Sequence, residues 1–168
     1  STTERTDAGI TVHRLWAHQP VTADPTFLGR IAYYLTLPLH ALLWLLINHG
    51  EFDALVTSSP PIFTGLAGLP IGPSTKTPWL VDVRDLWIDA AIGLGFLSEG
   101  SLLERVNRAY QRLVLSTADC VGMTTVELGE TLVNHYGINS GKLLHLPNGV
   151  DTARMRPSNN PESQTLVY

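Results

Sequence analysis

The chain has 168 residues, of which 44% are hydrophobic and 15% are charged. This balance excludes an intrinsically disordered polar segment, because such segments combine low hydrophobicity with a high net charge. The net charge is -4 with neutral histidines, the sequence pI is near 5.8, and no run of cations exceeds two. Proteins that bind nucleic acid usually show a basic face or a pI above about 9, so we expect no nucleic-acid partner.

The chain contains one cysteine, Cys120, which excludes an internal disulfide scaffold. Cys120 lies in an apolar run, which is typical of a small buried residue in a strand rather than of a nucleophile. The free cysteine and the polar residues 1–9, which show no signal-peptide pattern, favour a cytoplasmic location. The six histidines are scattered without the spacing of metal ligands, so we expect no metal and no cofactor.

The N-terminal part of the chain predicts few regular elements. Residues 1–9 carry no signal of a strand or a helix, and we expect a disordered or linker segment there. The alternating residues 10–16 predict a strand. The apolar segment 31–47 predicts a helix that stops at Gly50 and that is kinked or broken by Pro38.

The segment 31–47 leaves three interpretations open. A membrane-spanning helix needs roughly 20 apolar residues, and this segment is shorter and contains Pro38. One interpretation is a buried or half-buried helix of a soluble domain. Another is a helix whose apolar face docks in the membrane interface, because Tyr33, Tyr34 and Trp44 are aromatic residues of the interfacial type. The third is a true membrane span.

The rest of the chain alternates short apolar strands with helices. Ser101 is followed three residues later by Glu104, and this capping box predicts the start of one helix. Thr125 predicts the start of another helix, and Gly137 predicts its end. The predicted strands are 54–57, 79–83, 120–123 and 142–146, and the predicted helices are 62–69, 102–117 and 126–136.

Strands that alternate with helices are typical of a parallel sheet. The sequence therefore predicts an α/β fold with a Rossmann-like parallel sheet that carries helices on both faces. In such sheets, ligands bind beyond the carboxyl ends of the strands. We therefore expect functional residues in three segments that follow strands, at 57–61, 84–87 and 124–127.

Ser58 and Ser59 lie between a predicted strand and a predicted helix start. Hydroxyls and free backbone N–H groups at such a place can hold an anion or a sugar hydroxyl. The alternative interpretation is that these serines only cap the helix.

A dense group of charges surrounds the next strand end. Arg84 can grip a carboxylate or a phosphate, Asp85 can accept hydrogen bonds from hydroxyls, and the indole of Trp87 can stack on a sugar ring. Asp82, inside the strand, is expected to be a structural member of this group. The alternative interpretation is an arginine–carboxylate pair that only holds the loop.

Several short motifs stand in a recognisable order and spacing. They are TSSPP at 57–61, DVRDLW at 82–87 with GLGFL at 93–97, AD at 118–119 with TT at 124–125, and PNGVD at 147–151. Together they resemble the N-terminal domain of retaining glycosyltransferases of family 4, which have the GT-B fold. The nearest similarity is to enzymes that build cell-surface polysaccharides and lipid-linked glycans, and it covers residues 10–168.

The resemblance implies two Rossmann-like domains with an active site in the cleft between them. Residues 10–153 would form a partial acceptor-side domain. Residues 154–168 would form a linker and the start of a C-terminal domain that binds the nucleotide sugar. We therefore expect a piece of a longer protein that lacks both ends of the fold and is inactive alone. Many family members carry a histidine where this sequence has Arg84, followed by the expected Asp85.

The resemblance also implies an activity of the hexosyltransferase type, which moves a sugar from a nucleotide-sugar donor to a glycan or lipid-linked acceptor with retention of configuration. Arg84 and Asp85 are the implied catalytic residues and would orient the sugar. The implied substrate-binding residues are Ser58, Ser59, Trp87, Thr124, Asn148 and Gly149. A lipid-linked acceptor would lie at the inner face of the membrane, which gives a functional reason for peripheral membrane contact through 31–47.

Two other functions compete with this interpretation. A GT-B nucleotide-sugar 2-epimerase needs acid–base carboxylates and a histidine at the cleft, and the scattered histidines count against it. A non-catalytic sugar- or partner-binding α/β domain would use the same sheet without turnover. A further α/β domain beyond Tyr168 with two glutamates seven residues apart would favour the transferase.

Overall fold

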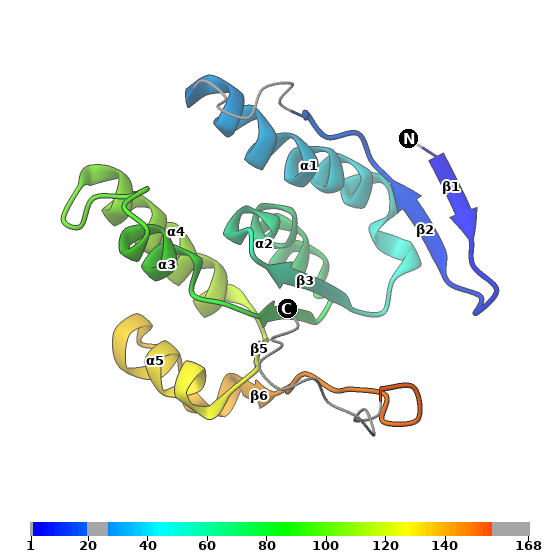
Figure 1. Cartoon of the computed structure of the whole chain (residues 1–168). Coiled ribbons are helices and arrows are strands. Elements are labelled where there is room, and N and C mark those ends of the chain that lie inside the picture. Colours follow the sequence, from blue (N-terminus) through cyan, green and yellow to red (C-terminus); the bar gives the residue numbers. More distant parts are fainter. Residues whose placement is uncertain (1, 20–26, 156–168) are drawn as a thin grey trace, which may run out of the picture.

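The computed structural model describes residues 2–19 and 27–155 (Figure 1). This part of the chain contains a hairpin of two antiparallel strands and a four-stranded parallel sheet with helices around it. The strands are β1 (Thr2–Arg5), β2 (Thr11–Arg14), β3 (Leu55–Ser59), β4 (Trp79–Val83), β5 (Cys120–Met123) and β6 (Leu143–His145). The helices are α1 (Phe27–Asn48), α2 (Gly65–Thr75), α3 (Trp87–Gly93), α4 (Leu102–Thr117) and α5 (Val126–Tyr136).

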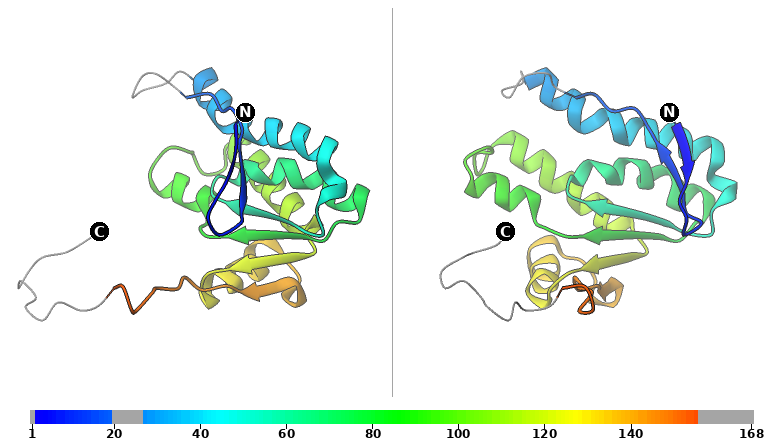
Figure 2. Two further views of the ribbon diagram at one scale, coloured as in Figure 1. Left: turned by 90° about the vertical axis from the view of Figure 1, so that its right-hand side faces the viewer. Right: turned by 45° about the vertical axis from the view of Figure 1, so that its right-hand side comes forward.

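The parallel sheet has the order β3–β4–β5–β6, so each strand pairs with the next strand along the chain. Parallel neighbours need a crossover connection, and α2, α4 and α5 lie in the three crossovers. The strands end at one edge of the sheet, and α3 extends beyond that edge (Figures 1 and 2). The predicted α/β fold with a Rossmann-like parallel sheet is confirmed.

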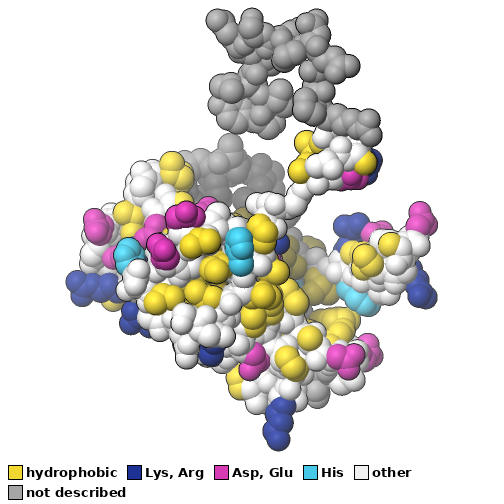
Figure 3. Space-filling model, turned by 90° about the horizontal axis from the view of Figure 1, so that it is seen from below, with side chains coloured by type: hydrophobic (Ala, Val, Ile, Leu, Met, Phe, Trp, Pro, Cys, Tyr) yellow, Lys and Arg dark blue, Asp and Glu magenta, His cyan; other side chains and the backbone are white. Residues whose placement is uncertain are grey.

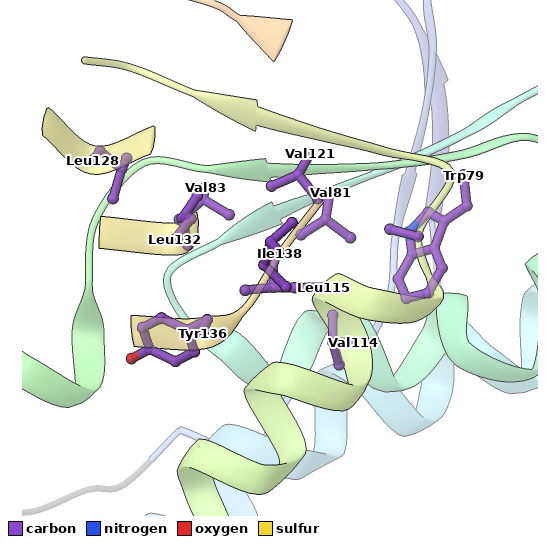
Figure 4. Packing of buried hydrophobic residues seen from close by; sticks show 11 residues of the cluster. Trp79, Val81, Val83, Val114, Leu115, Val121, Leu128, Leu132, Tyr136 and Ile138 are labelled. Atoms are coloured by element: carbon purple, nitrogen blue, oxygen red, sulfur yellow. The ribbon is translucent and has the colours of Figure 1, made fainter. Parts of the chain in front are cut away.

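One face of the sheet carries the main hydrophobic core (Figure 4). Trp79, Val81 and Val83 of β4 point to this face, and Val121 of β5 lies with them; all four are at most 3% exposed. Each side chain of this kind contributes roughly 1.5–3 kcal/mol when it leaves water, so the cluster is a main source of stability. The helical residues that cover the four strand residues are Val114, Leu115, Leu128, Leu132 and Tyr136.

Helices surround the sheet unevenly. Right-handed crossovers that always step to the next strand in one direction put all the connecting helices on the same face. Accordingly, α2, α4 and α5 pack on the face of Trp79. On the opposite face, Val56 of β3 is 63% exposed and Leu144 of β6 is 43% exposed. Within the described residues, the expectation of helices on both faces is therefore met on one face alone.

Helix α1 forms an outer layer on α2. Leu45 of α1 is 8% exposed and packs with Ala67 and Ile71 of α2. The helix continues past the buried Pro38, so the predicted break is not found. None of the helices that the structure describes has the length and hydrophobicity needed to span a membrane.

The structure differs from the expectation for residues 1–9. Strand β1 pairs antiparallel with β2, and Gly9, with φ +79°, lies in the connecting turn. Thr3 Oγ1 lies 3.0 Å from His13 Nδ1 across the pair. The side chains of β1 are all exposed, so this strand shows none of the apolar alternation by which a half-buried strand is recognised. Of the predicted linker 154–168, residues 156–168 lie outside the described part of the chain.

The other predicted elements are found, with shifts at their ends. Helices α4 and α5 begin at the predicted caps: Ser101 Oγ accepts a hydrogen bond from Glu104 N (3.1 Å), and Thr125 Oγ1 accepts one from Leu128 N (3.2 Å). Helix α2 is longer than predicted and runs to Thr75 through two prolines. Helix α3, of seven residues, was not predicted, because so short a helix has too few turns to show a period.

The described part of the chain leaves many large hydrophobic side chains exposed. Some of them gather near the middle of the face that is seen from below (Figure 3). Others lie on α1 and α4, where Ile47 and Leu102 are 82% and 78% exposed. Contiguous exposed apolar surface of this kind marks places that contact another molecule or segment.

Gly68→Ala should destabilise the protein, because a Cβ at this position would overlap the indole ring of the buried Trp79. Overpacking of this kind costs about 1–3 kcal/mol, which should appear as a lower midpoint of urea unfolding followed by circular dichroism. Gly93→Ala is the matched control, because Gly93 is also helical and no atom lies within 4 Å of its Cβ position. Equal midpoints for the two variants would contradict this packing.

Candidate functional site

Polar side chains from neighbouring strands meet near the carboxyl edge of the sheet. Ser58, Asp82 and Gly122 are register partners on β3, β4 and β5, so they lie on the same face. A Cβ on Gly122 would lie 3.2 Å from Asp82 Oδ1, so the glycine leaves room for this carboxylate. The cluster is built where parallel sheets place their ligands.

Asp82 and Arg84 form the centre of the cluster. Asp82 is 7% exposed, and its Oδ2 accepts a hydrogen bond from Arg84 Nε at 2.6 Å. Arg84 Nη1 donates to Asn148 Oδ1 at 2.6 Å, and the Arg84 backbone N donates to the carbonyl of Ser59 at 2.9 Å. Arg84 thereby joins the ends of β3 and β4 to the segment that follows β6.

Part of the Arg84 guanidinium stays available to bind a ligand. The side chain is 42% exposed, and Nη2 makes no hydrogen bond to the described residues. A buried carboxylate is costly unless it is paired, so Asp82 holds the arginine in place while the arginine neutralises Asp82. Asp82 Oδ1 is buried and has no hydrogen-bond partner among the described residues. The free N–H groups of Arg84 can bind an oxyanion or a sugar hydroxyl.

Asp85 and Trp87 lie at the start of α3. The Asp85 carboxylate is exposed, and its Oδ1 accepts a hydrogen bond from Leu86 N at 2.7 Å. Trp87 is half-buried, with its ring centroid 5.8 Å from that of Tyr34 and 6.2 Å from that of Phe63. The indole therefore packs in an aromatic cluster with α1, which reduces the surface it can offer to a sugar.

The two predicted serines point to opposite faces of β3. Ser58 is exposed, and its Oγ donates to Asp82 Oδ2 at 3.5 Å, so it belongs to the cluster. Ser59 is 6% exposed and lines a small cavity with Gln111 of α4. Strand alternation puts the Ser59 hydroxyl on the core face, so the structure does not bring it to Arg84.

The remaining predicted residues follow β5 and β6. Thr124 is half-buried directly after β5, and Gly149 is exposed, with no atom within 4 Å of its Cβ position. Among the described residues, Asn148 is the member of this group that contacts Arg84. In the same ranges, no three His, Cys, Asp or Glu side chains are placed to hold a metal ion.

Asp82 was expected to be a structural member of the charged group. Its carboxylate binds Arg84 directly, which agrees with a role in holding the arginine. The available signal was a charged residue in an otherwise buried strand, two positions before an arginine, since charged residues are rarely buried without a partner.

A second polar cluster holds α3 against α4 and α5. Arg108 donates to Asp89 at 2.7 Å, to Glu104 at 2.5 Å and to the Tyr136 hydroxyl at 3.1 Å. The Arg108 guanidinium holds the pKa of Glu104 below its ordinary value, and burial raises the pKa of Tyr136 to about 12. These contacts fix α3, which follows the Arg84 segment, relative to the rest of the domain.

Glu104→Gln should lower the free energy of unfolding at neutral pH and have a smaller effect in acid. Because the folded-state pKa of Glu104 is lowered, its ionised form contributes stability above the ordinary value of 4.5 and loses that contribution as the pH falls through the lowered value. Urea unfolding across this pH range should therefore show a shrinking difference between the wild type and E104Q. A difference that is the same at every pH would contradict the pair with Arg108, and the exposed Glu130→Gln serves as control.

The family model described as "Glycosyl transferase 4-like domain" matches residues 1–149, which include the hairpin, the whole parallel sheet and the Asp82–Arg84–Asn148 cluster. No curated protein matches the chain. The four-stranded parallel sheet is consistent with the N-terminal domain of a GT-B enzyme. Since the match spans most of the sequence, the chain belongs to the glycosyl transferase 4-like domain family.

Proposed function

We propose that the chain is the acceptor-side half of a retaining, hexosyltransferase-type glycosyltransferase. The enzyme would move a sugar from a nucleotide-sugar donor to a glycan or lipid-linked acceptor. Membership of the family supports a glycosyltransferase role in general. The observation that carries the finer proposal is the cluster at the carboxyl edge of the sheet, where Asp82 and Asn148 hold Arg84 beside the exposed Asp85.

In the proposed reaction, an acceptor hydroxyl oxygen forms a bond to the anomeric carbon, and the bond from that carbon to the donor phosphate breaks. The nucleoside diphosphate leaves with the bonding electron pair and takes up the hydroxyl proton. Arg84 would donate hydrogen bonds to the reacting sugar or its phosphate, and Asp85 would accept one from a hydroxyl. Because Arg84 is already held by Asp82 and Asn148, it would orient the sugar at little further entropic cost.

The other proposed site residues divide by their contacts. Ser58 and Asn148 adjoin Arg84 and would line the acceptor side. Thr124 and Gly149 would line the wall of the cleft between this domain and the proposed donor-binding domain. Ser59 would act through its backbone carbonyl, which holds the Arg84 N–H. We therefore assign Ser59 to support of the site.

Trp87 would act as a supporting residue as well, through its packing with α1.

We assign the nucleotide-sugar donor mainly to a further domain outside this chain. The chain by itself is therefore proposed to be inactive in sugar transfer, and we propose no metal or other cofactor for the reaction.

In the full-length enzyme, Arg84→Ala and Asp85→Ala should each lower kcat/KM for sugar transfer at least roughly tenfold, or about 1.4 kcal/mol of transition-state stabilisation. Asp85 is exposed, so Asp85→Ala should fold like the wild type. Arg84→Ala leaves the buried Asp82 carboxylate without its partner, so its rate is compared after circular dichroism has shown that the variant is folded. Release of nucleoside diphosphate measures the rate. Asp53→Ala, an exposed carboxylate before β3, is the control.

The same assay separates the competing functions. Wild-type transfer by both variants would remove Arg84 and Asp85 from the site. A full-length protein that binds nucleotide sugar or glycan without turnover would be a binding protein. Inversion at carbon 2 of the donor sugar would identify an epimerase.

We also infer peripheral membrane contact through α1, at the cytoplasmic face of the membrane. Leu45 packs on α2, whereas Leu39, Leu43 and Ile47 are 45%, 59% and 82% exposed. These three residues are spaced by four along the helix and therefore form one stripe. An apolar stripe on a surface helix fits shallow insertion into the membrane interface.

Changing Leu39, Leu43 and Ile47 together to serine should lower flotation of the full-length protein with liposomes, because the inserted apolar area is lost. The buried Leu45 stays unchanged, so the packing of α1 on α2 is kept. Val56→Ser, at an exposed position of β3, is the control. Flotation that survives the triple change would count against docking through α1.

A further inference from the structure

Two buried polar atoms that line one cavity have no hydrogen-bond partner within the described residues. They are Ser59 Oγ of β3 and Gln111 Oε1 of α4. Ser59 is 6% exposed and Gln111 is 3% exposed, so both side chains are shielded from bulk water. A buried polar atom without a hydrogen bond is costly, and most such atoms in folded proteins are paired. Two unpaired atoms on the same cavity therefore point to a shared ligand.

The cavity has the size of one water molecule. Its volume is about 10 Å³, which is roughly the smallest space that holds a single water. None of the side chains that line it is charged, so it is unsuited to an ion. Apart from Ser59, Gln111 and Thr64, its walls are apolar, and Figure 4 shows four of the residues that form them: Val81, Val83, Val114 and Leu115. A wholly apolar cavity stays dry, whereas the polar groups here favour water.

The surrounding contacts keep the cavity open. Gly65 of α2 and Val114 of α4 meet at one wall, where a Cβ on the glycine would lie 2.6 Å from Val114 Cγ1. Closer approach of these two helices would make their atoms overlap. Ser59 and Val83 are register partners in the sheet, so β3 and β4 fix the backbone at the Ser59 wall. Because both walls are fixed, a bridging molecule is the remaining way to pair Ser59 with Gln111.

A water molecule complements the hydrogen-bonding groups of the cavity. The Ser59 hydroxyl can donate a hydrogen, and the Gln111 amide oxygen can only accept one. A water can accept from the first and donate to the second. Thr64 Oγ1 is bonded to the carbonyls of Ser58 (2.7 Å) and Pro61 (3.0 Å), so its hydrogen is used while a lone pair can accept the second water hydrogen. These three bonds are the usual number for a buried water.

We propose that this cavity binds one structural water molecule, which bridges Ser59 of β3 and Gln111 of α4. The bridge would tie the carboxyl end of β3 to the helix that covers it. The Ser59 backbone carbonyl accepts the hydrogen bond from Arg84 N at 2.9 Å, so the same bridge would steady the peptide that holds Arg84. It also gives a reason for a glutamine on the buried face of α4. The proposal rests on the cavity and not on sugar transfer.

The first test looks for the water directly. In a high-resolution crystal structure of the full-length protein, one density peak should lie within hydrogen-bond distance of Ser59 Oγ and Gln111 Oε1. In solution, magnetic relaxation dispersion of water oxygen-17 counts internal waters with long residence times. The double variant Ser59→Ala, Gln111→Met should hold one such water fewer than the wild type. An empty cavity, a direct bond between Ser59 and Gln111, or an unchanged count would overturn the proposal.

Urea unfolding provides a second test. Ser59→Ala and Gln111→Met should each lower the midpoint, and the double variant should lower it by less than the sum, because removing both partners leaves neither one unpaired. Asn107→Leu is the matched control, since Asn107 is also buried on α4 but bonds to Leu103 O of its own helix at 2.8 Å. Its effect should add to that of Ser59→Ala. Additive effects for Ser59 and Gln111 would contradict the bridge, whatever the transfer activity of the enzyme.

Discussion

The packing of Trp79 against α2 is the contact on which the arrangement of the domain depends. The indole is 1% exposed, and it occupies the space that a side chain at Gly68 would need. Its Nε1 donates to Thr57 Oγ1 at 3.0 Å, and its backbone N donates to Asp119 Oδ2 at 2.8 Å. One residue therefore joins β3, β4, α2 and the segment before β5. This connection holds α2 on that face of the sheet.

Two arginines, Arg84 and Arg108, lie at the centres of the two polar clusters of the domain. They differ in whether all of their side-chain nitrogens are hydrogen-bonded within the domain. Arg108 uses Nε, Nη1 and Nη2 for Glu104, Tyr136 and Asp89, so its hydrogen bonds are directed inward. Arg84 uses Nε and Nη1 within the domain, and its Nη2 makes no hydrogen bond to the described residues. A partly buried cation with unused donors at a strand end is suited to a ligand, whereas one with paired donors is suited to structure.

Both α1 and α4 expose apolar side chains, and the reason for this exposure differs between the two helices. In α1 most residues are apolar, and Leu39, Leu43 and Ile47 are exposed on the side that faces away from α2. In α4 the buried face carries Val114 and Leu115 together with the polar Glu104, Asn107 and Gln111, so the apolar Val106 and Leu113 remain exposed. The ion pairs of Arg108 with Glu104 and Asp89 join this helix to α3.

Local signals in the sequence determined the parallel α/β fold, the caps of α4 and α5, and Arg84 as a residue at the edge of the sheet. Such signals lie within a few residues of one another, as in the pair of Ser101 and Glu104. The tertiary structure alone decided that Ser58 bonds to Asp82 while Ser59 lines a cavity with Gln111, and that Val106 and Leu113 of α4 stay exposed. These features depend on contacts between residues far apart in the chain, and no local periodicity encodes which face of an element its neighbours will cover.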